Sequence, residues 1–491
     1  MTEVSRWSAW SDRLNPILVR EITQALKGRA FIILLSLALA SIVVTTLVVA
    51  AEGVNQAGAG RDYFVVALTL LTPIAIVLVP IQAFQSMQAE LKGGAGEQLL
   101  MSDLSPAKIV RGKITAAMVQ VFLFLSVFGP MLAMTFLLRG VDVATIGFFL
   151  VMTLACSLVA TSFAVAMGSL TRAKILSSLL FAGTASALGF SAVGLMAGME
   201  EITREISSLL QDNDFWIGIG ITLTAFAVAI GLFSMIARSL LTHPYENKST
   251  QFRVLAIVGI VVAVIWIVSA APMRHWGDAG LALAMGSPMV LVVFWLFAVT
   301  EEERLSIRVK TMVPRSRGLA WLVAPFLPGG GRGSLFMVVT AIFTILLATI
   351  LHALSPTTRS PRMIEGAVAS WCYAFFYAGL GRIVRSRLPV GPQGTWIARL
   401  LTPILLILGC VIPIFLELMM RGHVGSWSPL HATNPFWSMD RISRVDDVVP
   451  IIAIGAFVVM LLNVPAMTSG LTEVLQASDT RRRREQKVDA S

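Results

Sequence analysis

Long apolar runs constrain this chain more than any other feature of its sequence. The hydrocarbon core of a bilayer is about 30 Å thick, so a helix needs about 20 residues to cross it. Twelve runs of roughly that length occur, separated by charges or turn residues. They lie at residues 30–50, 63–84, 114–137, 144–168, 175–198, 216–236, 254–272, 280–298, 335–353, 366–381, 399–418 and 449–470.

Composition agrees with a chain that is mostly embedded in lipid. Hydrophobic residues make up 56% of it and charged residues 13%, against roughly 45–50% and 25% in soluble domains. We therefore expect an all-α, polytopic integral membrane protein with about 12 transmembrane helices, arranged as two six-helix halves. The weakest span is 366–381, which is short and flanked by Glu365 and Arg382.

The distribution of basic residues predicts how the chain is oriented. Twelve spans place both termini on one side, and that side holds 29 of the 38 Lys and Arg, whereas the 28 acidic residues divide 14 and 14. Because basic residues concentrate on the cytoplasmic side of membrane proteins, both termini are expected in the cytoplasm. The net charge of +10 then belongs to a cytoplasmic rim, and we expect no nucleic-acid partner.

Residues that hold metals or cofactors show no suitable spacing. The three cysteines lie far apart within apolar runs, which argues against a disulfide framework and a Cys-based zinc site. The four histidines expected on the outer face show no HExxH pattern. We expect no metal and no cofactor. The residues concerned are Cys156, Cys372, Cys410, His275, His352, His423 and His431.

Catalytic patterns are also missing from the sequence. The glycine-rich string PGGGRGS at residues 328–334 lacks the Gly-Lys-Ser/Thr ending of a phosphate loop, and no Walker A pattern occurs. GFSAVG around Ser191 is not a G-x-S-x-G elbow. Glu417 is the charge that comes nearest to lying within a span, and we expect it to reach the outer interface. The chain is therefore predicted not to be an enzyme.

Two segments near the amino end carry more information. Residues 15–30 predict an amphipathic helix leading into the first span, with Ile17, Leu18 and Ile22 on one face and Arg20 on the other. Residues 84–114 form the first cytoplasmic loop, in which three glycines at 93–96 precede an apolar stretch and Pro106 marks a helix start. Such a loop allows a soluble partner to move two spans together.

These segments resemble permease subunits of ABC-2 type transporters. The resemblance covers about residues 13–250 and consists of an N-P-x-L-x-R-E opening, a loop in the style E-R-E-x-G-T-x-E-x-L-L-x-T-P-L-S, and an I-V-x-G-K lead into the third span. The matching residues are Asn15, Pro16, Leu18, Arg20, Glu21, Glu90, Gly94, Glu97, Leu99, Leu100, Leu104, Ser105, Ile109, Val110, Gly112 and Lys113.

The resemblance implies a division into parts and a docking site. Residues 1–29 would form a cytoplasmic amphipathic helix, 30–250 a six-span permease unit with its coupling loop at 85–113, 251–470 a second six-span region, and 471–491 a basic cytoplasmic tail suited to membrane lipid. The acidic loop before the sixth span would hold short external re-entrant helices. Coupling to a separate ATP-binding cassette ATPase subunit would involve Arg20, Glu21, Glu90, Glu97, Leu99, Leu100, Leu104 and Lys113.

The expected function is that of the permease subunit of an ATP-driven transporter in the bacterial cytoplasmic (inner) membrane. ATP hydrolysis by the partner would drive substrate export or movement. A second copy in a homodimer, a related permease, or residues 251–491 would complete the path. Two alternatives stay open: an ion-coupled secondary transporter, disfavoured by the scarcity of buried charge, and a membrane scaffold subunit that does not transport.

Overall fold

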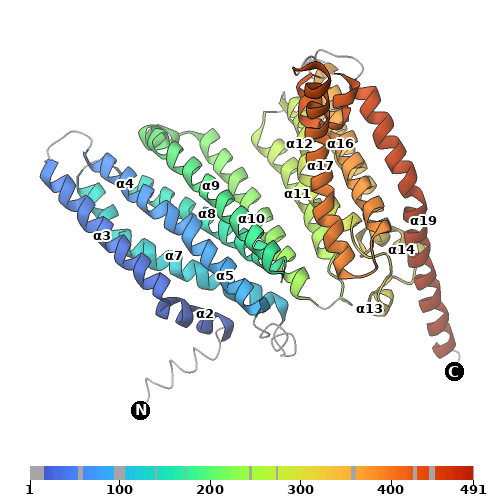
Figure 1. Ribbon diagram of the computed structural model, residues 1–491, viewed down its shortest axis with the longest axis horizontal. Helices are drawn as coiled ribbons and strands as arrows, with labels where there is room; N and C mark the ends of the chain where they lie inside the picture. The colour runs from blue at the N-terminus through green and yellow to red at the C-terminus, as the bar shows by residue number, and fades with distance from the viewer. Residues whose placement is uncertain are drawn as a thin grey trace. The chain divides into compact units, whose positions relative to one another are not determined.

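The computed structural model describes residues 16–52, 59–92, 105–138, 141–171, 173–242, 246–272, 275–354, 361–423, 428–441 and 448–489. Within these residues twelve helices are long and apolar enough to cross a membrane, so the predicted all-α polytopic fold is confirmed. The chain divides into two compact units, Met1–Thr242 and His243–Ser491. Six of the twelve helices lie in each unit (Figure 1).

Unit 1 begins with a short helix and continues with six spanning segments. The second spanning segment is assembled from α4, a π-helical turn and α5, and helix α8 packs against α5, α7 and α10. The elements are α2 (Pro16–Lys27), α3 (Arg29–Glu52), α4 (Ala59–Pro73), η1 (Ile74–Leu78), α5 (Val79–Lys92), α7 (Pro106–Leu137), α8 (Val143–Ser169), α9 (Lys174–Leu209) and α10 (Asn213–Leu241).

Pro80 leaves one carbonyl of the π turn in the second span without a backbone donor. In this turn the Val79 N–H bonds to the Ile74 carbonyl, five residues back. The next bond of this register would come from residue 80, which is a proline and has no N–H. The Ala75 carbonyl instead accepts from the Ser157 hydroxyl of α8 at 2.8 Å. A side chain from a neighbouring helix thus replaces the missing backbone donor.

Unit 2 also contains six spanning helices, and α16 lies at its centre in contact with α12, α17 and α19. Short helices fill the connections. The elements are α11 (Thr250–Ala270), α12 (Trp276–Val299), α13 (Ile307–Lys310), α14 (Arg317–Val323), η3 (Ala324–Phe326), α15 (Gly330–Leu354), α16 (Pro361–Arg387), α17 (Pro392–Arg421), η4 (Pro429–Thr433), α18 (Pro435–Arg441) and α19 (Val448–Asp489).

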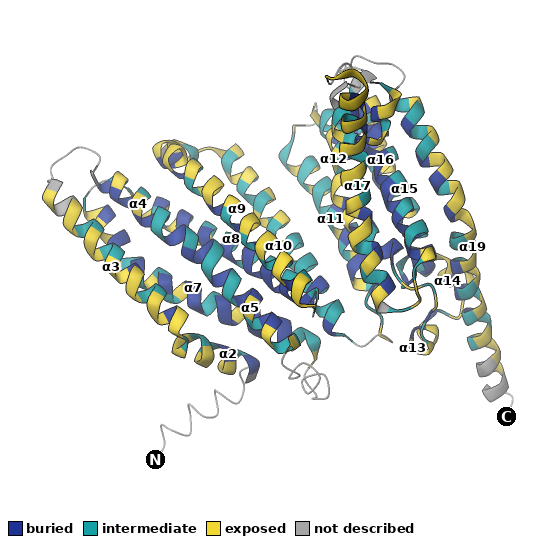
Figure 2. Cartoon of the chain, viewed as in Figure 1, coloured by how far each residue is buried: buried dark blue, intermediate teal, exposed yellow. Residues whose placement is uncertain are grey.

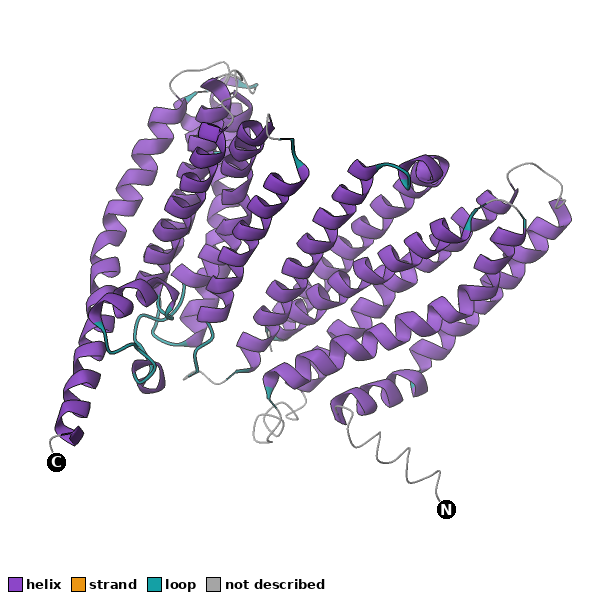
Figure 3. Cartoon of the chain, turned by 180° about the vertical axis from the view of Figure 1, so that it is seen from behind, coloured by secondary structure: helices purple, strands orange, loops and turns teal. Residues whose placement is uncertain are grey.

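Burial separates outer helices from inner ones within each unit. Figure 2 shows many exposed residues along α3 and α17, and these residues are largely apolar. An apolar exterior is what a helix in contact with lipid tails requires. Figure 3 shows that the described chain consists of helices and loops, with no strand in the parts drawn in colour. The chain is therefore a multi-pass membrane protein by architecture as well as by composition.

Several helices extend beyond the apolar runs that predicted them. Helix α7 begins at Pro106, next to Ser105, and so includes Lys113 in its second turn. Helix α9 continues to Leu209 as one element through Glu200 and Glu201, and α10 begins at Asn213. The expectation of separate re-entrant helices in this acidic stretch was wrong. Hydropathy locates the lipid-embedded part of a helix, whereas hydrogen bonding continues into polar residues outside it.

Candidate functional site

One end of unit 1 contains a group of four charged residues and one serine from three helices, which we call the charge cluster. It comprises Arg20 and Glu21 of α2, Ser86 and Glu90 of α5, and Lys113 of α7. The helix α2 packs against α7, and Figure 1 shows it at the same end of the unit as the last turns of α5. The cluster therefore joins the helix before the first span, the end of the second span and the start of the third.

Lys113 is the centre of the charge cluster. Its side chain is 1% exposed, and its Nζ lies 3.0 Å from a Glu21 carboxylate oxygen and 3.1 Å from one of Glu90. Nζ also donates to the Ser86 hydroxyl at 2.6 Å. Three N–H donors and three acceptors are thus matched, as a buried ammonium group requires.

The remaining contacts close the network. The Ser86 hydroxyl donates to the second Glu21 oxygen at 2.7 Å. Arg20 lies 3.1 Å from Glu21 and also pairs with Glu90. Two cations and two carboxylates therefore cancel in net charge, and each carboxylate touches both cations.

Electrostatics keep the Glu21 carboxylate ionised. Burial alone would raise the pKa of Glu21. The positive charge of Lys113 and the hydrogen bonds from Ser86, Lys113 and Arg20 outweigh it, and the pKa of Glu21 lies below its usual value of 4.5. Near neutral pH Glu21 therefore keeps its ion pairs with Lys113 and Arg20.

A cavity of about 440 Å³ lies beside the charge cluster. Its walls combine the charged residues with small apolar side chains of α5 and α7 and with Gln24, Gln82 and Gln120. The side-chain oxygen of Gln120 is buried and has no hydrogen-bond partner among the described residues. The charge cluster thus borders a cleft lined by both polar and apolar side chains.

The end of α5 is held on its other face as well. The Gln88 amide donates to the carbonyl oxygens of Gly168 at 2.7 Å and Thr171 at 3.1 Å, at the end of α8. Ser177 of α9 donates to the Gln88 amide oxygen at 2.9 Å and accepts from Lys92 at 2.8 Å. The last turns of α5 are thereby tied to α2 and α7 on one face and to α8 and α9 on the other.

The structure brings together four of the eight residues predicted to couple to a partner. Arg20, Glu21, Glu90 and Lys113 form the charge cluster. The other four, Glu97, Leu99, Leu100 and Leu104, lie outside the described residues. Residues 93–104 connect α5 to α7, so the predicted docking segment is attached at both ends to helices of the charge cluster.

Sequence reasoning missed two polar residues that complete this arrangement, Ser86 and Gln88. Ser86 precedes Glu90 by four residues, so the two share a helix face, and that spacing was the signal available. Glu21 was taken for a motif residue only, although it lies four residues after Ile17 on the face predicted to be apolar. A carboxylate at such a position needs a buried cation, and Lys113 supplies it.

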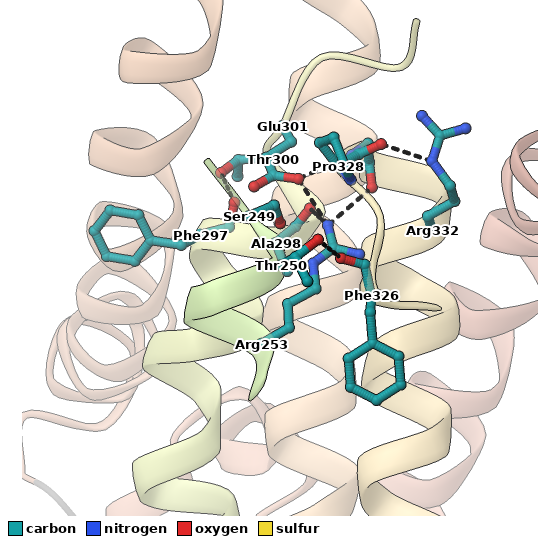
Figure 4. Close-up of polar contacts among 12 residues, drawn as sticks. Ser249, Thr250, Arg253, Phe297, Ala298, Thr300, Glu301, Phe326, Pro328 and Arg332 are labelled. Carbon is teal, nitrogen blue, oxygen red and sulfur yellow. Dashed lines mark hydrogen bonds and ion pairs between the residues drawn. The ribbon is translucent and has the colours of Figure 1, made fainter. Parts of the chain in front are cut away.

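Unit 2 has its own network of buried arginines, centred on Arg253 of α11 and Arg332 of α15 (Figure 4). Arg253 at the start of α11 pairs with Glu301, just after α12, at 2.7 Å. It also donates to the carbonyl oxygens of Pro325 at 2.6 Å and Gly329 at 3.3 Å. The arginine thus fastens the connection between α12 and α15 to the first helix of the unit.

Arg332, in the first turn of α15, has a similar role. It donates to the carbonyl oxygens of Pro328 and Glu303 at 2.6 Å each, and it pairs with Glu473 of α19 at 3.0 Å. Its guanidinium group also donates to the Gly470 carbonyl at 3.2 Å. The Pro328 and Glu303 carbonyls lie in the connection between α12 and α15, and the several N–H donors of a buried guanidinium can bond to them and to the Gly470 carbonyl of α19 together.

The glycines around Arg332 have a packing role. A Cβ at Gly333 would overlap the Ala298 carbonyl of α12, and one at Gly331 would overlap the Ala466 carbonyl of α19. Helix α15 therefore approaches two neighbouring backbones too closely for any side chain. The glycine-rich string is explained by this contact between three helices.

A third buried charged group lies at the C-terminal end of α17. Glu417 is 2% exposed and lies 3.0 Å from the His431 Nε2 and 3.1 Å from Arg421. Glu417 was expected at the outer interface; it lies in the last turns of α17, covered by His431 of the next short helix, whose ring packs against Trp437. Among the residues described, no group of three or more His, Cys, Asp and Glu side chains is arranged to hold a metal.

Comparisons with known proteins give no family assignment. No protein-family model, curated protein or solved structure matches this chain.

Proposed function

We propose that the chain is the membrane subunit of an ATP-driven transporter of the ABC-2 type. In this proposal it lies in a bacterial cytoplasmic membrane with both termini in the cytoplasm, and a separate ATP-binding subunit hydrolyses ATP. The charge cluster of unit 1 is the observation that supports it. It links both ends of residues 93–104 to the helix before the first span.

The geometry suggests how movement would be transmitted. A partner that displaces residues 93–104 pulls on the last turn of α5 and the first turns of α7 together. Because Lys113 contacts both Glu21 and Glu90, α2 would follow as part of the same body. Gln88 carries the displacement to α8 and α9, so most of unit 1 would shift in response to one contact. Rearrangement of this kind is the basis of alternating access.

The test is purification of the tagged full-length chain from its native membranes in mild detergent, followed by photolabelling with 8-azido-ATP. We expect the label on a separate, co-purifying polypeptide and none on this chain. Replacement of Glu97, Leu100 and Leu104 by Ala is expected to lower the co-purified ATPase activity by about tenfold, the loss produced by removing about 1.4 kcal/mol of binding energy.

A matched control comes from an exposed ion pair of unit 1. Glu200 and Arg204 are each 61% exposed, so Glu200→Gln should leave the co-purified activity unchanged. Label on this chain itself, or ATPase activity that survives the triple Ala replacement in full, would contradict the proposal.

An ion-coupled carrier is the alternative that one observation favours. Such carriers use buried ionisable groups, and Glu417 is buried against His431 and Arg421. A carrier should catalyse flux in liposomes from the chain alone under an imposed proton or sodium gradient, and Glu417→Gln should abolish that flux. Absence of flux without a partner and ATP would reject the carrier and leave the ATP-driven proposal standing.

A further inference from the structure

The connection between α12 and α15 in unit 2, residues 300–329, folds into a compact platform against α19. Its apolar side chains form a core with Val474, and Ala320 of α14 belongs to that core. The Ser478 hydroxyl donates to the Pro314 carbonyl at 2.8 Å, and Arg317 forms a two-bonded ion pair with Asp479 at 2.9 and 2.6 Å. Figure 1 shows α14 beside α19.

The helix α14 leaves large apolar side chains outside this core. Leu319, Trp321 and Leu322 are 55%, 58% and 60% exposed. They occupy three of the seven positions of α14, and the Trp is of the type enriched at membrane interfaces. These side chains require an environment in which both an indole ring and aliphatic groups are stable.

The position of the platform along α19 indicates which environment surrounds these side chains. The Gly470 carbonyl accepts from Arg332 at the start of α15, so this level marks the edge of the spanning bundle. Val474 and Ser478 lie four and eight residues further on, about 6 and 12 Å at 1.5 Å per residue. The headgroup layer on each side of a bilayer is about 5–7 Å thick. The platform thus begins at headgroup depth.

Charge in this region is basic on balance. Residues 300–329 contain five Lys and Arg and three Glu, and two of these, Glu301 and Glu303, pair with the buried Arg253 and Arg382. The adjoining part of α19, residues 471–483, adds three arginines and two acidic residues. Those two, Glu473 and Asp479, are paired with Lys310 and Arg317 of the platform. A basic surface with exposed Trp and Leu at this depth complements anionic phospholipid headgroups.

We propose that residues 300–329 form a lipid-binding platform that places Leu319, Trp321 and Leu322 in the headgroup layer and is held there by anionic phospholipid. The platform anchors the ends of α12, α15 and α19 to the membrane surface. This proposal requires no partner protein and is independent of the function proposed above.

The test uses the full-length chain in phosphatidylcholine vesicles that contain a brominated lipid as a quencher of Trp fluorescence. The difference between the wild-type chain and Trp321→Phe isolates the signal of Trp321. We expect brominated phosphatidylglycerol to quench this signal about twofold more than brominated phosphatidylcholine at equal mole fraction, because anionic lipid gathers at basic surfaces.

Two further variants make the result specific. Trp216 lies in the first turn of α10, near the acidic Asp212 and Asp214, so the signal isolated by Trp216→Phe should show no preference for the anionic lipid. Arg304→Gln combined with Arg308→Gln should reduce the preference at Trp321 while leaving quenching by phosphatidylcholine. Failure of both lipids to quench Trp321 would mean that protein or water covers the face, and equal quenching would exclude anionic recognition; either result overturns the proposal.

Discussion

Individual charged residues in this chain are stabilised by contacts with residues that are distant in the sequence. Lys113 and Glu21 are 92 positions apart, yet their side chains meet at 3.0 Å. Both residues belong to the sequence motifs described above. Their pairing, however, depends on how α2 packs against α7, and local sequence patterns do not predict that packing. Ser86 shows the same limit, since a serine near a span end carries no signal until its neighbours are placed.

Lys113→Met is expected to destabilise unit 1 by about 3–5 kcal/mol, the usual cost of removing one partner from a buried ion pair. The variant leaves the Glu21 and Glu90 carboxylates buried without their central cation. Unfolding of the purified chain in detergent–SDS mixtures would measure the change. The double variant Lys113→Met with Glu21→Gln should lose less than the sum of the two single variants. Strict additivity would show that the two residues do not interact.

The stability of unit 1 should also depend on pH through Glu21. Its pKa is lower in the folded chain than the usual 4.5, so the folded state favours the ionised form. This contribution is fully present above about pH 4.5 and is lost as pH falls through the folded-state pKa. Thermal unfolding between pH 3 and 7 should show a smaller acid loss for Glu21→Gln than for the wild type. An identical acid profile would contradict this assignment.

At the scale of single helices, the sequence predicted the lipid-embedded parts well and the helix ends poorly. The span expected at 366–381 was the weakest, yet α16 runs from Pro361 to Arg387. Helix α16 is the most buried of the twelve spanning helices found among the described residues, and a helix surrounded by protein does not need a uniformly apolar surface. Hydropathy therefore underestimates the length of helices inside the bundle, whereas it identifies the exposed, apolar helices α3 and α17 clearly.

Close approach of helices around α15 can be tested with two glycines. Gly333→Ala places a methyl group against the Ala298 carbonyl, and we expect a loss of about 1–3 kcal/mol or more, as for overpacked cores. Gly286→Ala in α12 meets nothing within 4 Å and should be neutral or stabilising by up to about 1 kcal/mol. Thermal stability of the two variants in the same detergent provides the comparison. Equal stabilities would mean that α15 is not in close contact with α12.

At the scale of the whole molecule, the described residues contain two units, each with six helices long and apolar enough to cross a membrane. The number and order of helices followed from apolar runs and charge because the bilayer imposes both length and composition. The side-chain contacts inside each unit could not be predicted from the sequence. Any apolar residue satisfies the hydropathy of a span, but only particular residues fit together in its packing. The arginine network of unit 2 was unpredicted for that reason, as its partners are mostly backbone carbonyls.

The predicted orientation can be measured by labelling single cysteines. In a background without Cys156, Cys372 and Cys410, an impermeant maleimide should label Gln211→Cys in intact cells. Ala95→Cys should be labelled only after the membrane is permeabilised, because the distribution of basic residues predicts a cytoplasmic position for that connection. Labelling of Ala95→Cys in intact cells would invert the topology and remove the basis for an ATP-binding partner there.

The π turn at Ile74–Leu78 determines which way the end of the second span faces. A bond that spans five residues instead of four accommodates one additional residue in that turn, and one residue of helix corresponds to a rotation of about 100°. Every side chain from Val79 to Lys92 is displaced by that angle relative to an unbroken helix. In this rotated position Glu90 pairs with Lys113 and Gln88 bonds to the Gly168 carbonyl of α8. Deleting a single residue from the turn would swing both away from their partners while every charge in the sequence stayed in place.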